Sequence, residues 1–480
     1  MQETKRRRNS CFSWRAYILI VPRAVSSIIE TWRLGIPAVT DYAARPMTMP
    51  VAIGVDFGTT NTVVALGDGS DQARLVAFET PSEPSTTFRS ALSFNHDPAD
   101  PSGRAVNVGP WAIKAYLEDP SETRFIQSFK SYAASPLFRE TVVLGRRYTF
   151  EDMLSEFLLR LRDKAGGALD AAGGRVIVGR PVRFVGATPD IALAMQRYQS
   201  AFKRLGFTDI LYAYEPVAAA FFFARRLEQD ATVLVADFGG GTSDFSIIRF
   251  ERKGGKLGAR ALGQSGVGLA GDAFDYRIID NLVSPALGKG SSYRDLNKIL
   301  LAPNRFYTSF ARWEQLALMR ASRDMRDIRT LMRKSLEPEK VARLVELLDG
   351  NYGYPLYQAV SKLKETLSVE TSARFEFNAG AINLQATVER SAFDGWIIRE
   401  LAAIEAAVDE AMADADLTPH QIDRVFLTGG SSFVPAVRAL FEARFDPAKI
   451  AAGAELESIA SGLALMGGEA DVERWCERVG

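Results

Sequence analysis

The sequence predicts an α/β protein with two similar lobes around a central cleft. A buried strand, an aspartate, a turn of glycine and threonine, and a second strand follow one another over Val51–Leu66. The same order returns over Thr232–Ile248, and a third glycine turn follows another apolar strand over Val425–Ser432. A repeated strand–turn–strand unit with helical segments between its copies indicates internal duplication of an α/β unit.

Short apolar runs bounded by glycine, proline or aspartate predict the strands. They are Val51–Val55, Thr62–Leu66, Val176–Gly179, Ile210–Tyr214, Thr232–Ala236, Phe245–Ile248 and Val425–Thr428. Alternation over Phe375–Val388 predicts a hairpin with its turn at Asn378–Gly380. Residues 79–105 are rich in proline, serine and aspartate, so we expect an irregular surface loop there.

Apolar residues at helical spacing predict the helices. They are Phe150–Ala165, Asp190–Leu205, Pro216–Arg226, Ser391–Ala413, a segment that ends at Phe445, and Ser458–Met466. Residues 267–375 are expected to be mainly helical. Arginines recur over Arg312–Arg333 among acidic residues, which favours a solvated helix face and leaves a partner surface as the alternative. The run Phe221–Phe223 is expected in the core.

The composition argues against several classes of function. The chain has 480 residues, with 58 basic and 58 acidic side chains. This neutral balance argues against nucleic-acid and membrane binding, since both need a basic footprint. Two cysteines, Cys11 and Cys476, and two histidines, His96 and His420, cannot build a disulfide framework or a zinc cluster. We therefore expect a cytoplasmic protein whose metal ligands are oxygen atoms, which suits Mg²⁺.

Residues 1–48 differ from the rest of the chain. Lys5–Arg8 precede the apolar run Ala16–Val21, an order that resembles a signal peptide. The run is much shorter than the ~20 apolar residues that a membrane span needs. We interpret residues 1–48 as a disordered or spuriously translated extension, with Met47 or Met49 as the true start. A targeting or membrane-surface segment is the alternative.

The first glycine turn, over Asp56–Asn61, has the composition of a phosphate-binding loop. Gly58 permits a tight turn, whose successive N–H groups can form a nest for phosphate oxygens. Thr59 and Thr60 add hydroxyl donors. Asp56 ends the preceding strand and would contact a phosphate-bound Mg²⁺ through water. An ordinary hairpin is the alternative for this turn taken alone.

The second glycine turn lies between two strands, over Asp237–Asp244. It contains Gly239, Gly240, Gly241 and Thr242. Three consecutive glycines are costly to order, and a plain hairpin does not need them, whereas a loop around phosphates does. Asp237 and Asp244 supply carboxylates for Mg²⁺ and for orienting the attacking water.

The third glycine turn, Gly429–Pro435, follows a strand and precedes a helix. A glycine pair in this position allows the backbone to approach a flat ligand, here an adenosine. Taken alone, two glycines before a helix indicate only a turn.

In this order, the three turns resemble the phosphate-1, phosphate-2 and adenosine motifs of the actin/Hsp70/sugar-kinase superfamily. Tyr214–Ala220 resembles the first connect segment of Hsp70 proteins, and Gly271–Asp275 resembles an acidic-Phe-Asp stretch of their lobe II. The resemblance covers about residues 51–470. It looks closest to the short YegD-like Hsp70 proteins, which lack the peptide-binding half, through Phe125–Ser131, Val178–Pro181 and a long helical insertion in lobe II.

The resemblance implies a duplicated ribonuclease H-like fold, the two-lobed actin/Hsp70 ATPase fold, with a central nucleotide cleft. Lobe I would cover residues 50–231, with a smaller subdomain over about 81–150. Lobe II would cover 232–451, with a helical subdomain over about 267–390. Residues 452–480 would return as a helix to lobe I, and no peptide-binding domain is expected.

The resemblance also implies roles for single residues around ATP or ADP and Mg²⁺. Asp56, Asp237 and Asp244 would organise Mg²⁺ and water, and Glu215 would bridge the lobes near the metal. The phosphates would be held by Gly58, Thr59, Thr60, Asn61, Gly239, Gly240, Gly241 and Thr242. The nucleoside would be contacted by Lys364, Ser368, Gly429, Gly430, Ser431 and Phe433, and Gly271 and Asp272 are further candidates for nucleotide binding.

The sequence departs from the Hsp70 pattern in three places. The family's catalytic lysine follows a Val-Gly pair, but here Ile113 occupies that place and Lys114 comes one residue later. One helical step turns a side chain by about 100°, so Lys130 is a second candidate for the catalytic lysine. Glu365 replaces an arginine that stacks on adenine, and Phe433 replaces an arginine after the adenosine glycines, where its ring could stack on the base.

The leading interpretation is an Hsp70-like ATPase whose lobes close on Mg-ATP, with client or co-chaperone proteins as further partners. Three alternatives stay open. A small-molecule kinase of the same superfamily would need a substrate pocket between the lobes. An actin-like protein would form filaments with ATP. A pseudo-ATPase would bind nucleotide as a switch without hydrolysing it.

Overall fold

The computed structural model describes residues 52–479, with gaps at residues 71, 121, 171–173, 187, 226, 228, 254–255, 313–318, 320–322, 453–456 and 470. The predictions made for residues 1–48, including Met47 or Met49 as the true start, lie outside the described residues. No described helix is long and apolar enough to cross a membrane.

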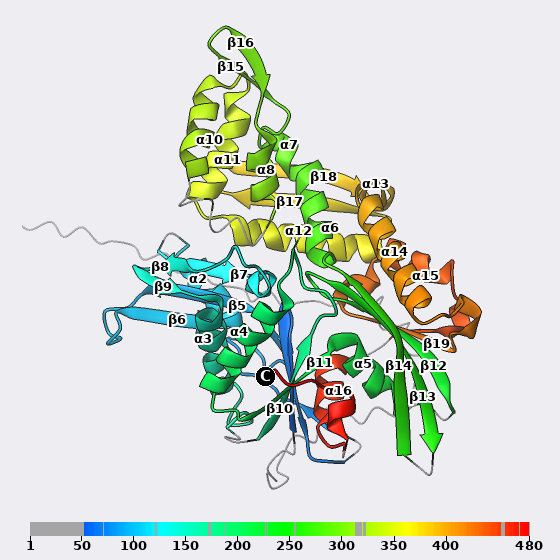
Figure 1. Ribbon diagram of the computed structural model, residues 1–480. Helices are drawn as coiled ribbons and strands as arrows, with labels where there is room; N and C mark the ends of the chain where they lie inside the picture. Colours follow the sequence, from blue (N-terminus) through cyan, green and yellow to red (C-terminus); the bar gives the residue numbers. More distant parts are fainter. Residues whose placement is uncertain are drawn as a thin grey trace, which may run out of the picture. The chain divides into compact units, whose positions relative to one another are not determined.

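Two mixed sheets with matching strand order form the framework (Figure 1). The first has the order β11–β10–β1–β2–β3, with β4 also paired to β2, and the second has the order β14–β13–β12–β19–β20. In each sheet, three strands form an antiparallel meander, and two more strands run parallel to the first of them. The predicted duplicated α/β fold is therefore confirmed. We call the part built on the first sheet lobe I and the part built on the second lobe II.

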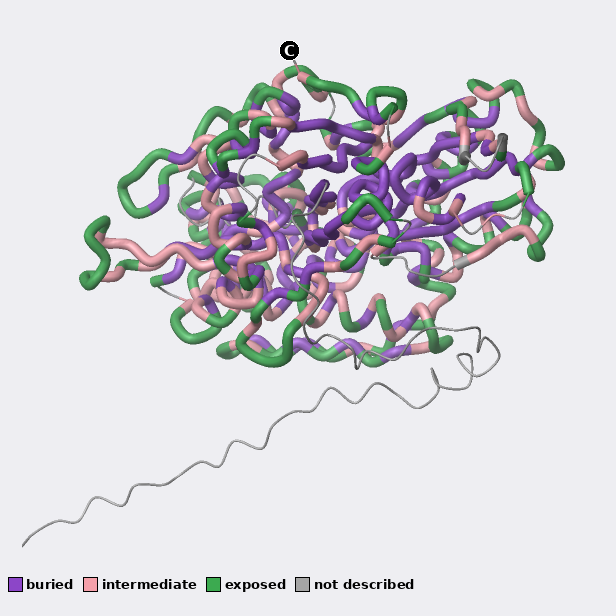
Figure 2. Tube along the Cα trace, turned by 90° about the horizontal axis from the view of Figure 1, so that it is seen from below, coloured by how far each residue is buried: buried purple, intermediate pink, exposed green. Residues whose placement is uncertain are grey.

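The strands of these sheets follow the predicted apolar runs closely. Their bounds are β1 Ala52–Phe57, β2 Asn61–Gly67, β3 Ala73–Leu75, β4 Thr87–Arg89, β10 Arg175–Arg180, β11 Asp209–Tyr214, β12 Ala231–Phe238, β13 Ser243–Lys253, β14 Lys256–Val267, β19 Arg424–Thr428 and β20 Ile450–Ala452. Figure 2 shows long buried stretches through the centre of the chain and exposed residues mainly at its periphery.

Helices α5 (Glu215–Ala224) and α16 (Ser458–Met466) pack on each other and join the cores of the two sheets. Glycine makes this close packing feasible. A Cβ at Gly462 would lie 1.8 Å from the carbonyl oxygen of Ala218, and one at Gly54 in β1 would lie 2.3 Å from that of Ala460. Phe221 and Phe223 are buried here, as predicted, and Phe223 stacks on Phe426 with ring centres 4.1 Å apart.

Lobe I also holds a small three-stranded sheet, a short hairpin and four helices. Their bounds are β5 Ala91–His96, β6 Arg104–Val108, β7 Arg124–Gln127, β8 Thr141–Val143, β9 Arg146–Tyr148, α2 Gly109–Glu118, η2 Phe129–Tyr132, α3 Phe150–Asp163 and α4 Ile191–Arg204. The irregular loop expected over residues 79–105 is wrong, because β4, β5 and the start of β6 lie there. Their side chains pack on α2 and α3, a tertiary contact that a polar local composition hides.

The rest of lobe II is mainly helical, as expected for residues 267–375. Its elements are α6 Gly271–Ile278, η3 Ile279–Val283, α7 Ser284–Ala286, β15 Ser292–Asp295, β16 Lys298–Leu301, α8 Asn304–Phe310, α10 Arg323–Lys334, α11 Pro338–Asp349, α12 Gly353–Val369, β17 Ser372–Ala379, β18 Ile382–Glu389, α13 Arg390–Trp396, α14 Ile398–Asp414, η4 Pro419–Gln421, η5 Gly430–Phe433, α15 Pro435–Glu442 and η6 Pro447–Lys449. A last short helix, η7 Val472–Arg474, follows α16, and Glu477 just after it forms a β-bridge with Tyr212 of β11.

Two details of lobe II differ from the predictions. The hairpin β15–β16 lies inside the segment expected to be helical. The single helix expected over Ser391–Ala413 is two helices, α13 and α14, which meet at Ile397. Ile397 is buried at this break, where the apolar spacing alone suggests a continuous helix.

The close packing at Gly462 generates a test. Gly462→Ala places a methyl group against backbone, which cannot move aside as a side chain can, and such overpacking costs typically ~1–3 kcal/mol. Gly395→Ala in α13 is the matched control, since nothing lies within 4 Å of the added methyl group. We expect urea unfolding to show a loss of stability for Gly462→Ala alone. Equal midpoints for the two variants would contradict this packing.

Candidate functional site

The two turns that repeat in the sequence have the same local structure. In the turn between β1 and β2, the N–H of Gly58 donates to the carbonyl oxygen of Asn61 at 3.0 Å. In the turn between β12 and β13, the N–H of Gly239 donates to the carbonyl oxygen of Thr242 at 2.9 Å. Each turn therefore closes around its two middle residues, whose N–H groups make no backbone hydrogen bond among the described residues and are available to a ligand.

The two turns face each other at close range. A Cβ at Gly240 would lie 2.4 Å from Oγ1 of Thr60, and one at Gly241 would lie 3.1 Å from Oγ1 of Thr59. A side chain at Gly240 would therefore displace the hydroxyl of Thr60 in the opposite turn. The N–H of Asp272 donates to the carbonyl oxygen of Gly240 at 2.7 Å, which ties the start of α6 to the second turn.

The third turn packs against the second. Gly429 has a φ of +82°, and a Cβ there would lie 2.1 Å from the carbonyl oxygen of Phe238. The hydroxyl of Ser431 donates to the carbonyl oxygen of Gly239 at 3.4 Å. A Cβ at Gly430 would meet nothing within 4 Å, and the ring of Phe433 is exposed. The three glycine turns thus meet at one place in the fold.

Carboxylates lie directly behind the first two turns. Asp56 is the last-but-one residue of β1, and Asp237 has the same place in β12, opposite Asp244 of β13. Burial, and then the negative charge of Glu215, raises the pKa of Asp56 to about 7, while Lys130 opposes the shift. The same two causes raise the pKa of Asp244 to about 7. This is a site in which negative charge is concentrated.

Asp237 experiences this repulsion from several sides. Burial is the largest cause that raises its pKa well above the ordinary value, followed by the charges of Glu215 and Asp56. Asp244 is fixed in place, because its Oδ1 accepts from the N–H groups of Val182 at 2.7 Å and Arg183 at 3.1 Å. Its Oδ2 is buried without a hydrogen-bond partner among the described residues.

A buried ion pair brings a positive charge to these carboxylates. Nζ of Lys130, in η2, lies 2.7 Å from Oε1 of Glu215 at the start of α5, and both side chains are buried. Burial disfavours the charge of Lys130, yet the attraction of Glu215 above all holds its pKa above the ordinary value. Ser128, just before η2, has a φ of +53°, so the backbone is strained where it delivers Lys130.

Lys114, the other candidate for the catalytic lysine, lies elsewhere. Its side chain is 52% exposed on α2 and pairs with Glu118 at 3.9 Å. Its ammonium lies 5.9 Å from the ring centre of Trp111. The structure therefore brings Lys130, and not Lys114, to the carboxylates.

The predicted nucleoside residues lie on α6, α12 and the third turn. Nζ of Lys364 lies 2.7 Å from the carboxylate of Asp275 and donates to the carbonyl oxygen of Gly271 at 3.3 Å. The hydroxyl of Ser368 donates to the carbonyl oxygen of Lys364 at 2.9 Å, within α12. Glu365 is exposed on the same helix. Lys364 thus reaches the edge of the glycine turns, whereas Ser368 bonds to its own helix.

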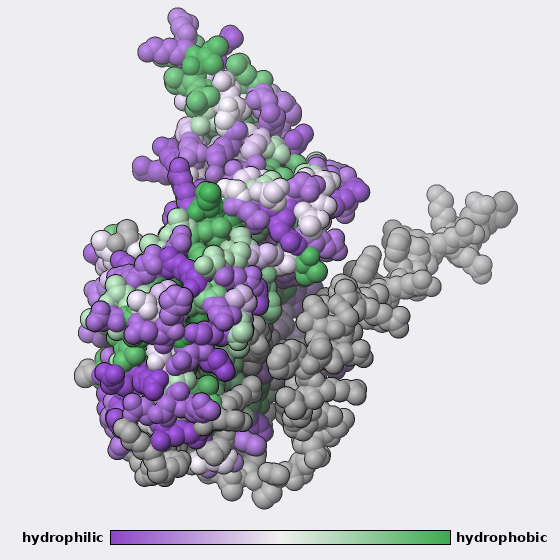
Figure 3. All heavy atoms as spheres, turned by 90° about the vertical axis from the view of Figure 1, so that its right-hand side faces the viewer, coloured by the Kyte–Doolittle hydropathy of each residue, from purple (hydrophilic) through white to green (hydrophobic). Residues whose placement is uncertain are grey.

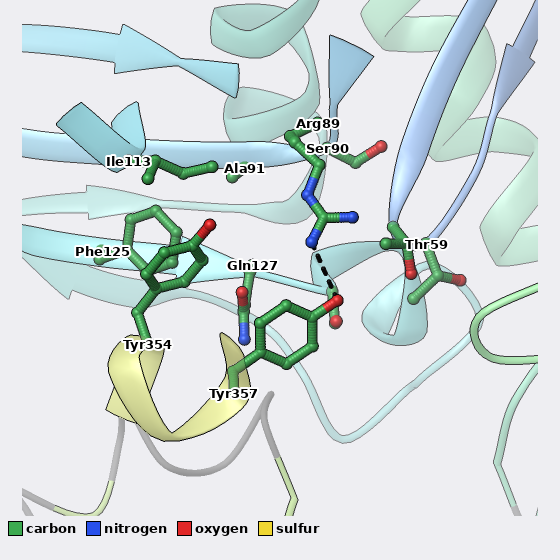
Figure 4. A pocket seen from close by; sticks show the side chains of 11 residues that line it. Thr59, Arg89, Ser90, Ala91, Ile113, Phe125, Gln127, Tyr354 and Tyr357 are labelled. Carbon is green, nitrogen blue, oxygen red and sulfur yellow. Dashed lines mark hydrogen bonds between the residues drawn. The ribbon is translucent and has the colours of Figure 1, made fainter. Parts of the chain in front are cut away.

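A small pocket lies beside the first turn (Figure 4). Side chains from both lobes line it, with Tyr354 and Tyr357 of α12 opposite Phe125 and Gln127 of lobe I. The full lining is Thr59, Thr60, Arg89, Ser90, Ala91, Ile113, Phe125, Gln127, Ser128, Tyr354 and Tyr357.

Arg89 lies between α12 of lobe II and the first turn, and its side chain contacts both. Its guanidinium donates to the hydroxyl of Tyr357 at 3.0 Å and to the side-chain oxygen of Asn61 at 3.2 Å. Sequence reasoning missed Arg89, Tyr354 and Tyr357. No local pattern marks them, because they come from strands and helices that are distant in the chain.

The carboxylate oxygens at the site are ligands of the kind that suits Mg²⁺. Among the described residues, no group of three or more histidine, cysteine, aspartate or glutamate side chains is arranged to hold a metal ion directly. Mg²⁺ keeps much of its water shell and is bound by few protein carboxylates together with phosphates. The unpartnered Oδ2 of Asp244 and the raised pKa of Asp237 are the features that a hydrated cation would relieve.

Comparison with protein-family models gives a match to the Hsp70 protein family. It covers residues 137–308 and 351–472, which is more than half of the chain. The chain belongs to the Hsp70 family. The match includes Glu215, the second and third glycine turns and most of lobe II, while the first turn lies before it. Membership in the Hsp70 family supports ATP binding and a chaperone type of function at that general level.

The buried pair of Lys130 and Glu215 generates a stability test. Lys130→Met leaves the Glu215 carboxylate buried without its partner, and breaking a buried pair in this way costs ~3–5 kcal/mol. We expect the added change Glu215→Gln to recover much of that loss, because no unpaired charge then remains.

Urea unfolding of the nucleotide-free protein measures these effects. Lys114→Met is the matched control, since an exposed substitution is expected to stay within about ±0.5 kcal/mol. Equal losses for Lys130→Met and Lys114→Met would rule out a buried pair at Lys130.

Proposed function

We propose that this Hsp70-family chain hydrolyses Mg-ATP between its two lobes, and that the state of the cleft acts as a chaperone-type switch. One observation carries the proposal most. Two turns of the same structure face each other through Gly240 and Thr60. The half-buried Asp56 and the buried Asp237 are the last-but-one residues of the strands directly behind them. In this arrangement, the turns offer hydrogen-bond donors to phosphates, and the carboxylates offer hydrogen-bond acceptors to the water molecules of a hydrated cation.

The turns would hold the phosphates. Gly58 and Gly239 would close the two turns through their own N–H groups. The backbone N–H groups of Thr59 and Thr60 from lobe I, and of Gly240, Gly241 and Thr242 from lobe II, would donate to phosphate oxygens. The hydroxyls of Thr59 and Thr60 add donors from the side chains. Asn61 would orient Arg89, which it contacts at 3.2 Å.

The carboxylates would position water. Asp56, Asp237 and Asp244 would accept from the water molecules around Mg²⁺, an ion that, when bound, supplies positive charge to the phosphates. Asp244 is held by two backbone N–H groups, so its free oxygen keeps a fixed direction toward an attacking water. Fixed acceptors cost no reorganisation during the reaction.

Lys130 would stabilise the negative charge that develops on the transferred phosphoryl group. Glu215 holds its ammonium in place at 2.7 Å. Positioning and charge are the main contributions that a protein makes to phosphoryl transfer. We therefore assign to Lys130 the role that the family's lysine has at another point of the chain.

The adenosine would lie across the third turn. Gly429, Gly430 and Ser431 would line its pocket, Phe433 would stack on the base, and Gly271, Asp272, Lys364 and Ser368 would contact the nucleoside from α6 and α12. The exposed ring of Phe433 suits such stacking. Arg89, which reaches across to Tyr357, would change partners as the lobes open.

The proposed partners and lobe boundaries rest on the family resemblance, and the proposed location rests on the low cysteine content. We propose client or co-chaperone proteins as partners, a cytoplasmic location and the division into lobes at residues 50–231 and 232–451. The described lining of the pocket includes no carboxylate or imidazole that could accept a proton from an alcohol. The pocket therefore gives the small-molecule kinase alternative no general base.

Single-turnover hydrolysis of Mg-ATP tests the proposal. We expect Asp237→Asn and Lys130→Met to lower the rate by about 10²-fold or more, as loss of a group that stabilises charge in the transition state does. Lys114→Met should keep the wild-type rate. ATP binding to each variant, measured by calorimetry, separates a loss of hydrolysis from a loss of binding.

Two results would count against this proposal. Wild type and Asp237→Asn hydrolysing at the same background rate would leave a nucleotide switch without ATPase activity. A drop with Lys114→Met and none with Lys130→Met would move the catalytic lysine to α2.

A further inference from the structure

The hairpin β15–β16 exposes apolar side chains to an unusual degree. Leu296 in its turn is 90% exposed, and Ile299 and Leu301 of β16 are 63% and 70% exposed. The hairpin lies at the upper end of the molecule in Figure 1, and apolar atoms gather in that region beside hydrophilic ones in Figure 3. Leu296 has a φ of +51°, a left-handed conformation that is unfavourable for a leucine. The chain therefore keeps a strained apolar residue at the tip.

One edge of the hairpin is covered and the other is open. On the β15 side, Tyr293 forms a β-bridge with Ser335, and the N–H of Leu336 donates to the carbonyl oxygen of Ser292 at 2.8 Å. On the β16 side, no backbone hydrogen bond joins Ile299 or Leu301 to another segment within the described part of the chain.

The register shows which groups point outward from that open edge. Asp295 lies opposite Lys298 across a two-residue turn, so these two residues form the hydrogen-bonded pair next to the turn. Hydrogen-bonded and non-bonded pairs alternate along the ladder, and the backbone groups of Ile299 and Leu301 therefore point away from β15. The two exposed apolar residues of β16 are also the ones with outward backbone donors and acceptors.

The surroundings of this edge are basic. Arg294 and Lys298 are exposed on the hairpin, and Arg333 is exposed at the adjoining end of α10. No ion pair with a carboxylate involves these three side chains within the described residues. Asp295, the acidic residue of the hairpin, is already paired with Lys334 at 2.6 Å. The open edge thus combines apolar side chains with uncompensated positive charge.

We propose that β16 is a docking edge for an extended polypeptide segment of a partner protein in which acidic and apolar residues alternate. The segment would pair with Ile299 and Leu301 as a third strand. Addition of a strand to an open edge is a common mode of peptide recognition, and main-chain hydrogen bonds supply much of its affinity. A two-stranded hairpin is only marginally stable in water, so a third strand stabilises it.

The charges favour this occupant over the alternatives. A second copy of the chain would bring the same basic side chains to the contact, and like charges face to face are destabilising. A lipid surface would attract the arginines but cannot satisfy the outward N–H and C=O groups of Ile299 and Leu301. An acidic strand supplies both the opposite charge and the hydrogen-bond partners.

Fluorescence anisotropy on the full chain tests the proposal. The probe is a labelled short peptide of alternating glutamate and valine, and the comparison peptide carries lysine in place of glutamate. We expect the acidic peptide to bind and the basic one not to bind. Ile299→Pro removes the outward N–H of Ile299 without removing a donor from the ladder to β15.

A second variant guards against a misfolded hairpin. Ile299→Ser with Leu301→Ser keeps the backbone edge and removes the apolar contacts, and Leu137→Ser is the control at a leucine that is 93% exposed in lobe I. We expect both hairpin variants to weaken acidic-peptide binding by about tenfold or more, and the control to leave it unchanged.

Several outcomes would overturn the proposal. They are failure of the acidic peptide to bind, equal binding of both peptides, and equal affinity in wild type and in the double-serine variant. If the peptide does not bind, co-sedimentation with vesicles of anionic phospholipid is the next measurement. Wild type that co-sediments and a double-serine variant that does not would instead identify a lipid-binding hairpin. Dimerisation in sedimentation velocity that the same variant abolishes would identify a second copy as the occupant.

Discussion

The buried contact between Lys130 and Glu215 is the interaction on which the rest of the site depends. Burial first, and then the negative charge of Glu215, raises the pKa values of Asp56, Asp237 and Asp244 above their ordinary value. Lys130 brings a positive charge into this group, held at 2.7 Å from Glu215. The arrangement costs folding free energy that an ordinary core would not, and a bound cation relieves it. We infer that the protein keeps a site tuned to positive charge at the expense of its stability in the empty state.

Duplication explains how one chain builds such a site. Each sheet supplies the same antiparallel pair of strands with an aspartate near the end of the first strand and a glycine turn after it. Helices α5 and α16 hold the two sheets together through backbone contacts that only glycine allows at Gly462 and Gly54. The turns then face each other at Gly240 and Thr60, so a small change in the packing of the two lobes directly changes the space for phosphates.

The sequence predicted those parts of the molecule whose determinants are local. The paired turns and their aspartates are recognisable because glycine runs after apolar strands have few structural explanations. The choice between Lys114 and Lys130 was left open, since it depends on how η2 packs against α5. Arg89 and Tyr357 were missed because their contact joins residues far apart in the chain. The strands within residues 79–105 were missed because their composition is that of a loop. The hairpin β15–β16 was missed because it lies in a segment that reads as mainly helical.

A crystal structure of the full chain with Mg²⁺ and a non-hydrolysable ATP analogue tests the central claim most directly. We predict the triphosphate between the turns of Gly58 and Gly240, with Nζ of Lys130 at hydrogen-bond distance, about 3 Å, from the terminal phosphate or the water beside it. Lys114 should stay exposed on α2. A nucleotide bound outside the two turns would contradict the account, and so would a terminal phosphate that Lys114 contacts and Lys130 does not.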